Sequence, residues 1–202
     1  MIIDIDNTVL SCDLRRAMLC SAILGREVTE TEVRHDLYCS RILTPVQQKS
    51  FFESFLSTKL MFLDSPYPLA ASTLDMLREN GIRIVYLSGR FSSPVDKGKV
   101  TREFMKRFGL LKEGDETIFK PSSLVYDSDF KRESINRLKH TYDILWAIDD
   151  TPHNLKIFKQ SGIFCIGITT SYPSLRFDFA DMVVDGWDEI KRLLEAGDNH
   201  RL

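Results

Sequence analysis

Short apolar runs alternate with amphipathic stretches along most of this 202-residue chain. Six runs rich in branched and aromatic residues predict strands, at Ile2–Ile5, Ile82–Leu87, Thr117–Phe119, Ile144–Ile148, Ile163–Ile168 and Met182–Val184. A stretch with helical spacing of apolar residues follows each of these runs except the fifth, and the first run only after a long insertion. These stretches are Leu69–Glu79, Val100–Phe108, Phe130–Lys139, Pro152–Gln160 and Trp187–Leu194. Such alternation predicts right-handed crossovers and a parallel sheet, and therefore an α/β fold.

One segment departs from this alternation. From Ser11 to about Pro66 the sequence has helical patterning and no convincing strand. Thr29-Glu30-Thr31-Glu32 is a capping box, and Thr44-Pro45 combines an N-cap residue with proline at the first helical position. The segment is too long for a simple loop, so we expect it to form a small helical unit.

The division of the chain follows from that segment. We expect a core made of residues 1–10 and 67–202, and an all-helical cap, residues 11–66, inserted after the first strand. The cap contains an aromatic stripe of Phe51, Phe52, Phe55 and Phe62. We interpret the stripe as the core of the cap; the alternative is that part of it lines a substrate pocket.

Composition limits the classes of partner. A formal net charge of -2, with 43% apolar and 28% charged residues, is typical of a soluble globular protein without general affinity for nucleic acid or anionic membranes. No signal peptide or membrane-spanning run is seen. The cysteines have no CxxC spacing and are expected to be buried free thiols, at Cys12, Cys20, Cys39 and Cys165. We therefore expect a cytoplasmic protein.

The most informative chemistry lies at the first predicted strand. Asp4 and Asp6 are two residues apart in an apolar run, so both project from one face if the backbone stays extended. Carboxylates in an apolar strand destabilise the fold unless a cation or a hydrogen-bond donor compensates them. A second acidic pair, Asp149-Asp150, ends a later apolar strand in the same way.

Other polar residues also lie at the end of a predicted strand or in a helix that leads into one. The second strand ends in Ser88-Gly89-Arg90, and Lys131 lies at the start of the helix that leads into the strand before Asp149. In parallel sheets of this kind, ligands bind outside the carboxyl ends of the strands. The sequence therefore predicts one site at that edge of the sheet.

Together these motifs resemble the haloacid dehalogenase superfamily of phosphohydrolases over nearly the whole chain. The DxDx[TV] motif is matched by Asp4, Asp6 and Thr8, and the strand ending in Ser or Thr by Ser88. Lys131 matches the family lysine, and Asp149-Asp150 the later acidic pair. The resemblance implies a Rossmann-like three-layer core with a helical cap. Within the family, the core motifs look most like the phosphatase domain of polynucleotide kinase-phosphatases, which nearly lack a cap.

The resemblance also implies roles for these residues. Asp4 would be the nucleophile that forms an aspartyl-phosphate, and Asp6 the general acid and base. Because dehalogenases lack the second aspartate, Asp6 favours phosphoryl transfer. Ser88 and Lys131 would bind and stabilise the phosphoryl group. Substrate contacts are also expected from residues of the same motifs, namely Thr8, Gly89 and Arg90.

Magnesium is the expected cofactor. A phosphate dianion approaching Asp4 needs a cation to offset the repulsion, and Mg²⁺ prefers hard oxygen ligands. We assign the metal site to Asp4, Asp150 and the backbone carbonyl of Asp6. Asp149 belongs to the same acidic set, either as a ligand or, with Asn154, as a residue that orients the ligands.

Several alternatives stay open. Lys120, in a Lys-Pro pair, competes with Lys131 for the role of the catalytic lysine, and Arg90 is either a substrate contact or a surface residue. The preferred function is hydrolysis of a small phosphomonoester. A phosphotransferase or mutase would use the same aspartyl-phosphate. A 3′-phosphatase that acts on nucleic acid or nucleotides is a further candidate. The long insertion disfavours a receiver-type signalling domain. The oligomeric state is not predicted.

Overall fold

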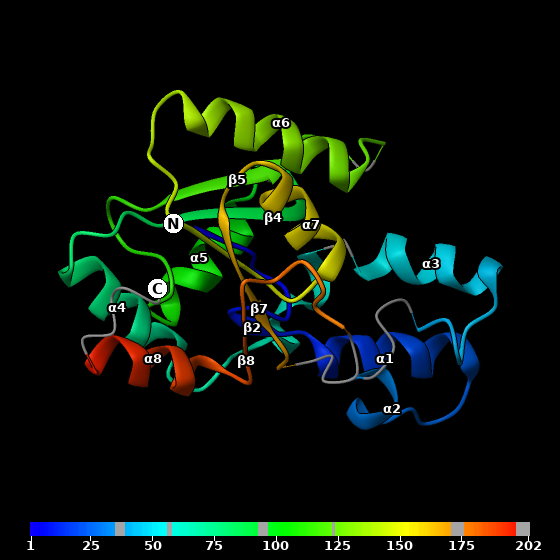
Figure 1. Cartoon of the computed structure of the whole chain (residues 1–202). Helices are drawn as coiled ribbons and strands as arrows, with labels where there is room; N and C mark the ends of the chain where they lie inside the picture. The colour runs from blue at the N-terminus through cyan, green and yellow to red at the C-terminus, as the bar shows by residue number, and fades with distance from the viewer. Residues whose placement is uncertain (35–38, 56–57, 93–96, 123, 171–175, 197–202) are drawn as a thin grey trace.

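A six-stranded parallel sheet forms the centre of the computed structural model (Figure 1), which describes all residues except 35–38, 56–57, 93–96, 123, 171–175 and 197–202. The strand order is β5-β4-β1-β6-β7-β8. The strands are β1 (Ile2–Ile3), β4 (Val85–Phe91), β5 (Glu116–Lys120), β6 (Trp146–Asp149), β7 (Phe164–Ile168) and β8 (Met182–Val184). The six predicted strands and their parallel pairing are confirmed, with bounds that differ by a few residues.

Helices cover both faces of the sheet and make three layers (Figure 1). The alternation of side chains along β1 shows how they divide. Ile3 packs in one cluster with Leu74 and Trp187, whereas Ile2 packs in another with Phe130 and Phe158. The first face carries α4 (Ala70–Glu79), α5 (Lys99–Arg107) and α8 (Trp187–Glu195); the second carries α6 (Asp127–Lys139) and α7 (Pro152–Gln160).

The inserted segment is mainly helical and has a hydrophobic cluster of its own, which includes Leu19, Val33 and Phe51. It contains α1 (Asp13–Leu24), α2 (Glu30–Arg34), α3 (Pro45–Phe55) and the 3-10 helix η1 (Thr58–Leu63). Helices α1, α2 and α3 lie to one side of the sheet (Figure 1). We keep the name cap for residues 11–66, a division that stays a prediction.

Both predicted helix starts in the cap are present. Thr29 N donates to Glu32 Oε2 at 2.8 Å, and Glu32 N donates to Thr29 Oγ1 at 3.3 Å. The same reciprocal bonds join Thr44 and Gln47 at the start of α3. These bonds satisfy amide groups that have no partner inside the helix.

Two expectations for the cap are wrong. The segment contains a short antiparallel pair, β2 (Leu10–Ser11) with β3 (Ser65–Pro66), which joins its two ends. Two-residue strands have no alternating pattern, so the sequence did not indicate them. Phe62 is 70% exposed and does not belong to the cap core, whereas Phe51 is buried.

Two predictions from composition are consistent with the structure. All four cysteines are buried and free. None of the described helices has the length and apolar character needed to cross a membrane.

Candidate active site

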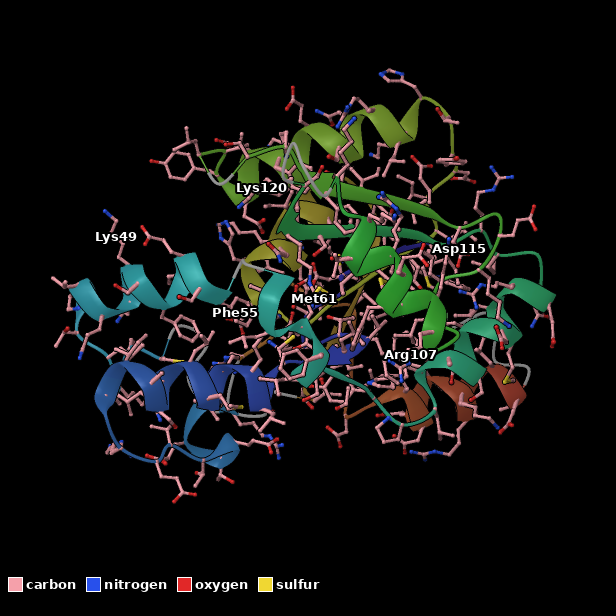
Figure 2. The ribbon with its side chains drawn as sticks, turned by 180° about the vertical axis from the view of Figure 1, so that it is seen from behind. Lys49, Phe55, Met61, Arg107, Asp115 and Lys120 are labelled. Atoms are coloured by element: carbon pink, nitrogen blue, oxygen red, sulfur yellow. The ribbon has the colours of Figure 1, made fainter. Side chains whose placement is uncertain are left out.

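Strand order brings the polar strand ends together, because β1 lies between β4 and β6. A cavity of about 290 Å³ opens at their carboxyl edge, between the core and the cap. Its core side is lined by Asp4, Asp6, Asn7, Gly89, Arg90, Lys120, Asp127, Asp150, Thr151, His153 and Asn154. Its cap side is lined by Arg16, Phe51, Phe52 and Phe55. Figure 2 shows Phe55 near the core-facing end of α3 and Lys120 on the core.

A row of buried charged residues lies next to Asp4, which lines the cavity. Lys131 projects from α6, and its Nζ lies 2.9 Å from Asp4 Oδ1 and 2.7 Å from Asp149 Oδ2. Asp149 also accepts hydrogen bonds from the side-chain amide of Asn154 and, at 2.8 Å, from the backbone N–H of Thr151. Both oxygens of Asp149 are therefore occupied, and this carboxylate holds Lys131 against Asp4.

The carboxylate oxygens of Asp4 and Asp150 that face the cavity are suitable ligands for a divalent cation. Each carboxylate of Asp4 and Asp150 has one hydrogen-bonded oxygen among the described residues, to Lys131 and Thr151 respectively. The second oxygen of each has no such partner there. Burial raises the pKa of Asp4, with Lys131 opposing the shift; burial and repulsion from Asp149 and Asp4 raise the pKa of Asp150. The pair therefore has more negative charge than the protein compensates, and hard oxygen donors suit Mg²⁺.

Asp6 lies in a different environment. Its Oδ2 accepts a hydrogen bond of 2.8 Å from Arg90 Nε. Its Oδ1 accepts bonds of 2.7 Å from Arg90 and 2.9 Å from Arg15. Although burial acts in the opposite direction, Arg90 and Arg15 hold the pKa of Asp6 below its usual range. Asp6 is thus ionised and paired in this arrangement.

The two arginines form a buried ion cluster with Asp6 and Asp64, here called the cap–core ion cluster. Arg90 Nη2 lies 2.9 Å from Asp64 Oδ2, and Arg15 Nε lies 3.0 Å from Asp64 Oδ1. Cys12 Sγ, which donates to Asp6 Oδ1 at 2.9 Å, completes a group whose ligand atoms lie within 4.8 Å of one another, Asp6, Cys12 and Asp64. Because two guanidinium groups already balance the two carboxylates, this group suits a metal ion less well than Asp4 and Asp150 do.

The remaining predicted contacts lie at different depths. Gly89 lines the cavity, and a Cβ there would lie 2.4 Å from Asp127 Oδ1, so only glycine permits this approach. Ser88 is fully buried and its Oγ accepts a hydrogen bond from Arg90 N. Thr8 is also fully buried and is not among the residues that line the cavity. Ser88 is absent from that lining as well, so the positions of Thr8 and Ser88 do not support the predicted substrate contacts.

Other residues at or near the cavity were not predicted from the sequence. Arg15 and Asp64 belong to the cap and approach Asp6 only in the folded protein, and no motif marks them. Asp127 lies one helical turn before Lys131 in α6. This spacing puts both residues on one face of the helix, and it was the signal in the sequence that could have identified Asp127. Arg90 was left open between substrate contact and surface residue; its side chain is buried and ion-paired.

Comparisons with known proteins agree with this architecture. A predicted phosphatase from Clostridium acetobutylicum has a TM-score of 0.70 and 16% identity, with 96% of this chain and 97% of that chain covered. A haloacid dehalogenase-like hydrolase from Streptococcus pneumoniae has a TM-score of 0.67 and 13% identity, with 96% of each chain covered. A predicted phosphoglycolate phosphatase from Haemophilus somnus has a TM-score of 0.65 and 15% identity, with the same coverage. The sequence matches no protein-family model and no curated protein.

The chain has the fold of the haloacid dehalogenase-like hydrolases, as the resemblance of its motifs implied. At these levels of identity the likeness concerns the fold. The activity is therefore argued from the residues at the cavity.

Proposed function

We propose that the protein is a Mg²⁺-dependent phosphatase that hydrolyses a small phosphomonoester through an aspartyl-phosphate on Asp4. The observation that carries this proposal is the row Asp4–Lys131–Asp149 beside a cavity that also contains Asp150. Neighbours of the same fold with phosphatase or hydrolase names support the reaction class.

Asp4 is suited to nucleophilic attack. Its carboxylate lines the cavity, and Lys131 fixes one oxygen, so the other oxygen is available to the phosphorus atom. Attack by Asp4 forms the P–O bond of an aspartyl-phosphate as the bond to the leaving oxygen breaks. This divides hydrolysis into two displacements.

Mg²⁺ would be held by Asp4, Asp150 and the backbone carbonyl of Asp6, and when bound it supplies the positive charge that offsets repulsion between the substrate phosphate and the carboxylates. Asp149 orients Lys131 in this proposal, because both of its oxygens are occupied.

Asp6 takes a proton in the second step. As an ionised carboxylate, Asp6 is able to accept a proton from the water that attacks the aspartyl-phosphate, and Arg90 and Arg15 make it a weak base. Giving a proton to the leaving oxygen in the first step requires a protonated Asp6, which its hydrogen bonds to Arg90 and Arg15 oppose.

The cap restricts the substrate. A cavity of about 290 Å³ is small, and Phe52 and Phe55 of α3 close one side of it. We therefore propose a small phosphorylated molecule, with a nucleic acid end disfavoured.

Hydrolysis of p-nitrophenyl phosphate, measured with Mg²⁺ and with EDTA, tests the proposal. We expect Mg²⁺-dependent turnover that is lost in Asp4→Asn. The control is Asp143→Asn, an exposed residue that precedes β6 and so lies at the opposite edge of the sheet. Turnover that persists in Asp4→Asn would exclude Asp4 as the nucleophile.

A further inference from the structure

We propose that Lys120 determines specificity by binding a second anionic group of the substrate, a carboxylate or a second phosphate, on the leaving-group side of the phosphoester. This inference rests on the proposed function of the same cavity. The structure brings together three observations: a buried ammonium, a lack of hydrogen-bond acceptors for it among the described residues, and a backbone position two strands from the nucleophile's strand.

The ammonium of Lys120 lies in a buried position with few partners. The residue is 8% exposed and lines the cavity. Its nearest charged partner is Asp127 Oδ1 at 3.9 Å, which is longer than a hydrogen bond. Among the described residues, no hydrogen bond from Nζ is found. An ammonium has three donors, and a buried polar group without acceptors destabilises the protein.

Asp127 does not satisfy this lysine either. Its Oδ1 is buried and has no hydrogen-bond partner in the described part of the chain. Asp127 is fixed close to the end of β4, because Gly89 leaves room for it. Lys120 and Asp127 therefore form a loose pair, and an incoming anion can bind Lys120 without breaking a hydrogen bond.

The backbone of Lys120 lies two strands away from the strand that leads to Asp4. β5 is two strands from β1, which separates their backbones by roughly 10 Å at the usual strand spacing. Lys131 already occupies the place beside Asp4. Because Asp127 precedes Lys131 by one turn of α6, the charges run in the order Asp4, Lys131, Asp127, Lys120. The two lysines thus serve different parts of one substrate.

The size of the cavity limits the distance between the two anions. In about 290 Å³, a carboxylate or phosphate that reaches Lys120 is separated from the phosphoester by only a few bonds. The proposed substrate class is a compact phosphomonoester with a second anionic group.

Matched pairs of substrates test this assignment. 2-Phosphoglycolate and 2-hydroxyethyl phosphate differ in a carboxylate, and propane-1,3-diyl bisphosphate and 3-hydroxypropyl phosphate differ in a second phosphate. In each pair, one member has a second anionic group and the other has only the phosphate. We expect the wild-type protein to prefer, in kcat/KM, the member of one pair that has both anionic groups, and the pair that responds identifies the second group. Lys120→Met should lower kcat/KM for that member by roughly 10- to 100-fold, the usual effect of losing a charged hydrogen bond. The kcat/KM for the member that has only the phosphate as an anionic group should change by less than about twofold.

Two further variants complete the experiment. Lys120→Arg keeps the charge and should retain much of the preference. Lys49→Met removes an exposed lysine of α3 and should change neither substrate (Figure 2). An equal loss on both members of a pair would show that Lys120 binds the transferred phosphoryl group, and no loss on either would also overturn the proposal.

Failure of the proposed function is recognised separately. If no phosphomonoester is hydrolysed, calorimetric titration of the Asp4→Asn protein with each matched pair measures binding without turnover. Tighter binding of the member with two anionic groups, if it disappears in Asp4→Asn/Lys120→Met, supports the subsite in the absence of hydrolysis. Equal binding of both members overturns it.

Discussion

At the scale of single residues, the buried ammonium of Lys131 compensates two buried carboxylates. Lys131→Met removes that cation and leaves Asp4 and Asp149 facing each other. We expect the variant to lose about 3–5 kcal/mol in the free energy of unfolding, the usual result of breaking a buried ion pair, together with phosphatase activity. Urea denaturation followed by circular dichroism measures the change.

The control for Lys131 is an exposed lysine in an ion pair. Lys159 pairs with Asp181 at the protein surface, and Lys159→Met should cost no more than about 1 kcal/mol. Similar losses in the two variants would contradict the idea that burial makes the Lys131 pairs important.

The ion pairs of Asp6 lead to a second prediction, on the dependence of rate on the leaving group. Arg90 and Arg15 keep Asp6 ionised, so Asp6 is a poor donor of a proton to the leaving oxygen. Substrates with good leaving groups should therefore be preferred. We expect kcat/KM for p-nitrophenyl phosphate to exceed that for an alkyl phosphate by at least about 10²-fold, the size of the missing acid catalysis. Equal rates for the two substrates would show that Asp6 donates a proton.

Sequence reasoning reached the site residues that follow strands. Asp4, Lys131 and Asp149 were predicted to share one edge, and the structure brings them into contact. Arg15 and Asp64 were missed, because their approach to Asp6 depends on how the cap folds back on the core. Local sequence carries no sign of that contact.

At the scale of elements, the cap–core ion cluster connects α1 and the end of η1 to β1 and β4. Arg15 also stacks on Phe55 of α3, with its guanidinium carbon 4.2 Å from the ring centroid. Arg15→Met leaves Asp6 and Asp64 with one guanidinium, and we expect it to lose about 3–5 kcal/mol in the free energy of unfolding. Arg15→Met/Asp64→Asn should lose less than the sum of the single variants, by about 0.5–3 kcal/mol.

Arg26 provides the matched control for this cycle. It lies in the same segment and pairs with Glu32 at the surface, so Arg26→Met should cost at most about 1 kcal/mol. Strict additivity of the Arg15 and Asp64 substitutions would mean that the cluster does not act as a unit.

The elements themselves were largely predictable, for a physical reason. Strands such as β6 and β7 are buried on both faces and are therefore continuous apolar runs, and helices such as α7 carry one apolar side. The pair β2 and β3 is held by contact between the two ends of the cap rather than by its composition. Phe62 illustrates the same limit, since apolar character alone did not show that it faces solvent.

At the scale of the whole molecule, the excess of buried negative charge links stability to pH and to metal. Burial raises the pKa of Asp4 from an ordinary value near 3.8 to about 8. The folded protein therefore binds more protons than the unfolded chain between these values, so in EDTA the free energy of unfolding should fall as pH rises from about 4 to about 8. Thermal unfolding in EDTA across this range measures the fall.

Mg²⁺ should reverse that loss, because it binds the ionised carboxylates of the folded protein. A concentration 100 times the dissociation constant stabilises by about 2.7 kcal/mol, and the effect should grow with pH. Asp150→Asn removes one carboxylate, so it should raise the melting temperature in EDTA and abolish the response to Mg²⁺. Asp143→Asn should leave both unchanged, since this exposed residue lies far from the acidic pair. An undiminished Mg²⁺ response in Asp150→Asn would place the cation elsewhere, with Asp6, Cys12 and Asp64 as the next set to test.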